Sequence, residues 1–201
     1  KGTAVTLIAA ASVTEDVYGM SIMFSGGFTA ATVYRHLTDI LIDPAGGTSW
    51  STAIPNLLCE GPTLIQGGYA YYFPIYLKSG TTIGAQTQCN AASHALRTCV
   101  QLYGKPSCPD LVRCGTHVEA IGVTTSSSSG TAITPGNGAV GAWTSMGTLS
   151  VDCWWYQWGG MVSNDTTVAT QKGYIGEISC GDASNKIIVH ASRCWMMTNE
   201  D

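Results

Sequence analysis

The sequence predicts an all-β protein built as an antiparallel β-sandwich. Short runs rich in Val, Ile, Thr and Tyr recur along the chain, and Gly, Pro, Ser and Asn separate them. No long amphipathic helical pattern interrupts these runs. With 201 residues, the chain can bury a core in one large sandwich or in two small ones.

The predicted strands share this composition. Alternation is clearest in Ala95–Tyr103, where Leu96, Val100 and Leu102 share one face and Arg97 and Gln101 share the other. The predicted strands cover Val5–Ala10, Tyr18–Ser25, Val33–Asp43, Tyr69–Leu77, Thr81–Cys89, Ala95–Tyr103, His117–Thr124, Leu149–Trp155, Met161–Ser163, Gly173–Cys180 and Lys186–Ala191.

An internal repeat indicates two related tandem units. Shifting the chain on itself by 138 residues sets Tyr18 over Tyr156 and Ile40 over Ile178, among other identities. The interpretation is a duplication, with one β-sandwich unit over residues 1–115 and a second over 116–201. The alternative is that Thr- and Gly-rich strands resemble one another without common origin.

Charge is sparse and evenly spread. Charged residues make up 11% of the chain, against about 25% in typical soluble domains, and the net charge is -4. Scattered Lys and Arg offer no basic stripe for phosphates, so we expect no nucleic-acid partner. The longest apolar runs are strand-sized, so we expect no membrane partner. Low charge suits a subunit whose surface is hidden in an assembly.

One segment carries a family resemblance. Tyr71-Tyr72-Phe73-Pro74 followed by Gly80-Thr81-Thr82-Ile83-Gly84-Ala85 resembles a motif of jelly-roll-like virion structural proteins of tailed bacteriophages. The resemblance implies a non-enzymatic subunit on the virion surface, assembled in the host cytoplasm, of the capsid-decoration, head-fibre, neck or tail type. It further implies a homo-oligomer, such as a ring or trimer, and contacts with other virion proteins such as the major capsid protein.

We find no catalytic motif and predict no cofactor. The four histidines, His36, His94, His117 and His190, show no catalytic spacing, and no nucleophile elbow or phosphate-binding loop occurs. Asp39 and Asp43 fall on one strand face, where we expect solvated surface charges, with calcium binding as the alternative.

Eight cysteines leave several states open. Cys108, Cys114 and His117 are the best zinc ligands, although they lack the usual Cys-x2-Cys spacing. A Cys108–Cys114 disulfide is an equally simple interpretation, and unmodified thiols are the third alternative. Cys153 and Cys180 are both predicted to point inward, where they form a second disulfide or remain buried thiols.

Aromatic residues gather near the middle of the second unit. Alternation places Trp154, Tyr156 and Trp158 on one strand face, opposite Trp155. So many rings cannot all enter one small core, so this face is predicted to be a subunit interface. The alternative function is a secreted or surface glycan-binding β-sandwich that stacks sugars on the same face.

Overall fold

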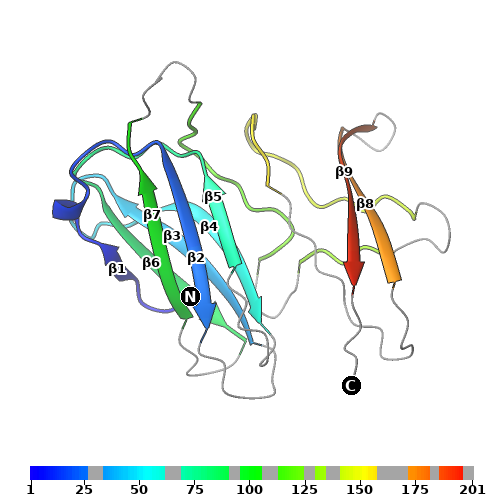
Figure 1. The fold of residues 1–201 in the computed structure, drawn as a ribbon, viewed down its shortest axis with the longest axis horizontal. Coiled ribbons are helices and arrows are strands. Elements are labelled where there is room, and N and C mark those ends of the chain that lie inside the picture. Colours follow the sequence, from blue (N-terminus) through cyan, green and yellow to red (C-terminus); the bar gives the residue numbers. More distant parts are fainter. Residues whose placement is uncertain are drawn as a thin grey trace. The chain divides into compact units, whose positions relative to one another are not determined.

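A computed structural model describes most of the chain, and Figure 1 shows its fold. The described residues are 1–26, 34–61, 69–90, 96–105, 113–124, 130–134, 141–157, 172–181 and 186–196. They divide into two compact units, each described here by itself. The first comprises Lys1–Ala132 with Ser145–Ser150, and the second comprises Ile133–Thr144 with Val151–Asp201.

The first unit is a β-sandwich of two antiparallel sheets, which confirms the predicted fold class (Figure 1). Its four-stranded sheet has the order β1-β6-β3-β4 and its three-stranded sheet the order β5-β2-β7. A short 3-10 turn, Ala10–Ser12, follows the first strand. The strands are β1 (Val5–Ile8), β2 (Gly19–Gly26), β3 (Tyr34–Asp43), β4 (Ser51–Gly61), β5 (Tyr69–Phe73), β6 (Thr82–Cys89) and β7 (Leu96–Tyr103).

Side chains from the inner faces of both sheets form one hydrophobic core. Strand β2 contributes every second residue to this core. Aliphatic side chains from β3, β4 and β6 of the four-stranded sheet pack in the same core. The fully buried side chains of this core include Met20, Ile22, Phe24, Ile40, Ile54 and Ile83.

Strand β7 confirms the alternation that the sequence predicts. Its even-numbered residues are half-buried against the core, and its odd-numbered residues are exposed. Each residue from Gly19 to Gly26 pairs with one residue of β7, without a bulge. The alternation in the sequence therefore corresponds to an alternation of half-buried and exposed side chains in the structure.

Strand β4 is absent from the sequence prediction, and Pro55 explains why. Proline lacks the N–H that a central strand needs, so its presence argues against a strand. In the structure β4 is an edge strand of its sheet, where a missing donor is tolerated, and its pairing with β3 shifts register around Ile40. Asn56, next to this irregularity, has a φ of 56°, in the left-handed region that Asn tolerates.

Gly84 on β6 allows Trp50 to lie against the sheet. A Cβ atom at Gly84 would sit 2.7 Å from the Trp50 ring and 3.0 Å from the Val5 carbonyl oxygen. We therefore expect Gly84→Val to lower the free energy of unfolding by about 1–3 kcal/mol. Urea unfolding checks this. The matched control is Gly80→Ala, which has open space around its Cβ position and so isolates the cost of its positive φ.

The second unit contains a hairpin of β8 (Lys172–Gly181) and β9 (Lys186–Met196). The shift of 138 that defines the sequence repeat carries the bounds of β3 onto the bounds of β8. Both the β3–β4 and the β8–β9 pairs are antiparallel. The β3–β4 pair shifts register between Thr38 and Ile40 and again between Ile40 and Leu41, and the single shift of β8–β9, between Ile178 and Ser179, corresponds to the second of these.

Two predicted strands are wrong. Residues 117–124 and 149–155 have irregular backbone in the structure. Both segments are rich in Val and Ile or in aromatic residues, but composition alone does not supply a neighbouring strand with which to pair. The predicted strand Met161–Ser163 lies outside the described residues.

Among the described residues, no helix combines the length and the apolar character required to traverse a bilayer.

Candidate functional site

Exposed aromatic residues dominate the described part of the second unit. Trp154, Trp155 and Tyr156 are 50%, 53% and 52% exposed, respectively. The two indole rings lie 6.1 Å apart and are tilted by 59°. Trp143 and Val151 in the same unit are also exposed. We call residues 151–157 the aromatic segment. Large apolar side chains grouped in this way are unusual on an isolated surface.

The aromatic segment differs from its prediction in one respect. Because residues 151–157 form no strand, Trp154 and Tyr156 do not share a strand face, and Trp155 is as exposed as its neighbours. Trp158 lies outside the described residues. The exposure is therefore greater than alternation predicts, since three consecutive rings face solvent.

A second aromatic group lies on the outer face of the three-stranded sheet. The Tyr72 and Tyr103 rings, on the two edge strands, meet edge to face with centroids 5.7 Å apart. Gly19 on the central strand leaves room for Tyr72, whose hydroxyl would lie 2.7 Å from a Cβ there. The Tyr103 hydroxyl lies 3.1 Å from Ser21 Oγ. We call these residues the tyrosine pair.

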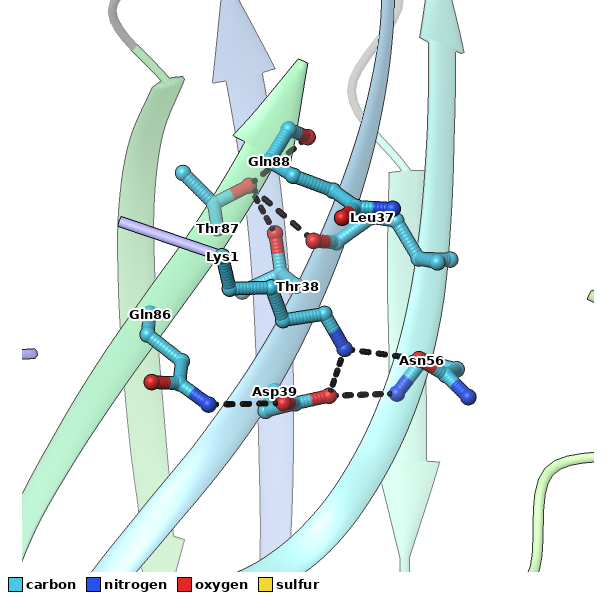
Figure 2. A network of polar contacts seen from close by, with 8 residues as sticks. All are labelled: Lys1, Leu37, Thr38, Asp39, Asn56, Gln86, Thr87 and Gln88. Carbon is cyan, nitrogen blue, oxygen red and sulfur yellow. Dashed lines mark hydrogen bonds and ion pairs between the residues drawn. The ribbon is translucent and has the colours of Figure 1, made fainter. Parts of the chain in front are cut away.

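Asp39 stands at the centre of a polar network on the four-stranded sheet (Figure 2). The carboxylate forms an ion pair with Lys1 and accepts hydrogen bonds from the backbone N–H of Asn56 at 2.9 Å and from Gln86 Nε2 at 2.9 Å. Burial opposes ionisation of Asp39, but the Lys1 ammonium and these donors outweigh it and lower the pKa of the carboxyl group.

The Asp43 carboxylate also has a structural role. Its two carboxylate oxygens accept hydrogen bonds from the backbone N–H groups of Ala45 and Ser49, at 2.9 and 2.8 Å, and so hold the turn between β3 and β4. Asp39 is 6% and Asp43 4% exposed. The expectation that they are solvated surface charges is therefore wrong. Protein donors occupy both carboxylates, and the calcium alternative gains no support.

The described residues hold no group of three or more His, Cys, Asp or Glu side chains suited to a metal ion. Cys114 Sγ lies 3.1 Å from the Tyr18 carbonyl oxygen, to which it donates. Burial raises the pKa of the Cys114 thiol. Cys108 lies outside the described residues, so the zinc prediction for Cys108, Cys114 and His117 stays a prediction.

The structure gives six cysteines as free thiols: Cys59, Cys89, Cys99, Cys114, Cys153 and Cys180. Cys153 and Cys180 are both free and exposed, so the inward orientation predicted for them is wrong. An irregular backbone at residue 153 removes the alternation on which that prediction rested. The pairing of Cys108 with Cys114 is not tested, although Cys114 is free in the structure.

Burial should separate the thiols by reactivity. Cys59 is buried in the core, and desolvation raises its pKa to about 11, whereas Cys99 is exposed on the outer face of β7. We expect iodoacetamide at neutral pH to label Cys99 in the native protein and Cys59 only after unfolding. Mass mapping of the labelled peptides measures this, and labelling of native Cys59 at the rate of Cys99 would contradict it.

The comparisons with known proteins identify no relative. No family model matches the chain, and no curated protein and no solved structure matches it.

Sequence reasoning missed both the Asp39 network and the tyrosine pair. Lys1, Asn56 and Gln86 are far from Asp39 in the chain, and their meeting depends on strand order and on a bulge. Tyr72 and Tyr103 belong to strands that were predicted. Strand β2 pairs with both of these strands, and this strand order, which the sequence does not show, places the two rings close together.

Proposed function

We propose that this protein is a non-enzymatic structural subunit of a virus particle of the tailed-phage type, placed at the particle surface. In this role it decorates or stabilises the capsid, neck or tail through contacts between β-sandwich units. Its partners are further copies of itself, as a ring or trimer, and other virion proteins such as the major capsid protein.

The exposed aromatic segment is the observation that carries this proposal. Trp and Tyr are favoured anchors at protein interfaces because they bury a large area at a small cost in side-chain entropy. In the described part of the second unit, Trp154, Trp155 and Tyr156 are each about half exposed. Burial of these rings against a neighbouring subunit gives them the apolar surroundings that they lack here.

Polar features of the first unit support a structural role. The buried carboxylates Asp39 and Asp43 are both satisfied by protein donors. They hold strands and a turn, and their geometry therefore supports stability rather than turnover. The sparse charge of 11% agrees with a surface that is largely covered in an assembly.

Tandem duplication fits the same role. The correspondence of β3 with β8, and of their register shifts, supports descent of the second unit from the first. Two related sandwich units in one chain give two similar surfaces, which suits repeated contacts on a symmetric particle.

Substitution of the two indoles tests the interface. We expect the purified chain to sediment as an oligomer and Trp154→Ala/Trp155→Ala to weaken association by at least about tenfold, because central Trp anchors each contribute about 2 kcal/mol or more. The melting temperature should change little. The control is Tyr72→Ala, an exposed aromatic residue in the first unit, which should leave association intact. A wild-type chain that stays monomeric at all concentrations contradicts the proposal.

Glycan binding by the aromatic segment is the competing function. Both functions require exposed rings, but a sugar platform requires binding that depends on sugar concentration and is lost in Trp154→Ala/Trp155→Ala. A glycan array with the wild type and this variant separates them. Saturable sugar binding by a monomer would favour the competing function.

A further inference from the structure

The side chain of Lys1 is held against a carboxamide and a carboxylate (Figure 2). Lys1 Nζ lies 2.6 Å from Asn56 Oδ1 and forms an ion pair with Asp39. The side chains of Lys1 and Asp39 are only 14% and 9% exposed. A lysine amine, the oxygen of a carboxamide and a carboxylate therefore meet at one place, where the two charged side chains are largely covered.

We propose that Lys1 and Asn56 form an intramolecular isopeptide bond, with Asp39 moving the proton that frees the amine. Lysine is a nucleophile once it is neutral, and a held geometry replaces the high concentration that the same reaction needs in solution. The product is a side-chain amide that joins Lys1 Nζ to Asn56 Cγ.

The reaction balances without an oxidant or a cofactor. Asp39 accepts a proton from the Lys1 ammonium, and the neutral Nζ attacks Asn56 Cγ. The new C–N bond forms, the Nζ group passes a second proton to Nδ2, and the Cγ–Nδ2 bond breaks. Nδ2 leaves as ammonia, which takes the proton held by Asp39 and becomes ammonium. The carboxylate is thereby restored, so Asp39 acts as a catalyst.

Burial and contacts place each group in its role. The ion pair holds the Lys1 ammonium directly against the Asp39 carboxylate. Because the surrounding donors lower the pKa of Asp39, the proton transfer is uphill, and the held geometry lets the neutral amine attack during its short lifetime. Asp39 is held as a carboxylate by Lys1, Gln86 and the Asn56 N–H, which makes it a poor target for nucleophilic attack. In Figure 2, the Asn56 Nδ2 atom points away from Asp39.

Asn56 is the favoured target because the backbone fixes it. Among the described residues, Asn56 is the one non-glycine residue with a positive φ, and it lies at the irregular part of β4 opposite Asp39. Gln86 offers a second carboxamide, but it uses its Nε2 to donate to Asp39.

The bond would tie together the two edges of one sheet. Lys1 precedes β1, and Asn56 lies on β4, at opposite edges of the order β1-β6-β3-β4. A link between them closes a long loop, which stabilises the fold by restricting the unfolded chain. Such a staple suits a protein under mechanical load, but its formation does not depend on the proposed function.

Intact-mass measurement of the denatured protein tests the proposal. We expect a mass lower than that of the sequence by one ammonia. Trypsin should release residues 1–35 joined to residues 36–78, since Lys1 no longer offers a cleavage site. Lys1→Arg should restore the full mass, because its guanidinium is not a nucleophile. Asp39→Asn should restore it too, with circular dichroism as the check on folding. Lys78→Arg, a change at an exposed lysine, is the matched control and should keep the loss.

Three results would overturn the proposal. The first is the full sequence mass in the folded wild type. The second is loss of ammonia that persists in Lys1→Arg, which would indicate succinimide formation at Asn56. The third is loss of water in place of ammonia, which would make Asp39 the target.

Discussion

Phe24→Ala should lower the free energy of unfolding by about 3–5 kcal/mol, the range for loss of a buried aromatic side chain. Phe24 is 1% exposed and lies on β2, the central strand of its sheet. Its ring meets that of Tyr71 edge to face, at 6.1 Å, and it belongs to the core shared by both sheets. Truncation leaves a cavity that neighbours on paired strands cannot fill without breaking their register.

Met23→Ala is the matched control for this experiment. Met23 is the neighbour of Phe24 on the same strand, but it points to the opposite face and is only half-buried. We expect its loss to cost about 1 kcal/mol. Urea unfolding of both variants gives the comparison. Equal losses would contradict a core that lies between the two sheets.

Asp39→Ala should lower the free energy of unfolding by about 3 kcal/mol, since removal of one partner leaves a shielded charge uncompensated. The change strands the cation at position 1, which is the Lys1 ammonium or the guanidinium of Lys1→Arg, together with the Asn56 N–H and Gln86 Nε2. Measured in a Lys1→Arg background, where no link to Asn56 can form, the loss reports on the polar contacts alone. A loss below about 0.5 kcal/mol in that background would mean that water replaces these contacts.

The lowered pKa of Asp39 predicts that the free energy of unfolding decreases at acidic pH. The pKa of Asp39 is lower in the folded protein than its ordinary value of 3.8. Its contribution to stability is therefore complete above pH 3.8 and is lost as the pH falls below that value, through the folded pKa. Asp16, whose pKa is lowered by the Ser79 N–H and the Tyr76 hydroxyl, titrates in the same window.

Comparison with Asp39→Asn separates the two groups. In Lys1→Arg/Asp39→Asn, the unfolding free energy measured between pH 5 and pH 2.5 should fall less steeply than in Lys1→Arg, in which no link forms either, because only Asp16 and other acids remain. Identical slopes would show that Asp39 has the same pKa in the folded and unfolded chains.

The sequence predicts the strands of the first unit well wherever one face is buried. In β7 the alternation of Leu96, Val100 and Leu102 with polar neighbours is directly visible in the burial pattern. Prediction fails where tertiary context overrides a local signal. Pro55 hides β4 because the sequence does not state that this strand lies at an edge.

The candidate site is less predictable, for two physical reasons. Asp39 and Asp43 are on one face of β3, as predicted, but Lys1, backbone donors and a turn cover that face. The aromatic segment was expected to be strand, and its irregular backbone depends on the lack of a pairing partner. The composition predicts that some of the aromatic rings are exposed. The sequence does not show how those rings are arranged.

Hydroxyl-radical footprinting of the purified protein across a range of concentrations tests the assembly role most directly. Trp154, Trp155 and Tyr156, which are exposed in the single chain, should lose reactivity as the mass from light scattering rises above that of one chain. Tyr72 and Tyr103 serve as internal references. Undiminished oxidation of the three rings in an oligomer, or a monomer at every concentration, would contradict the account.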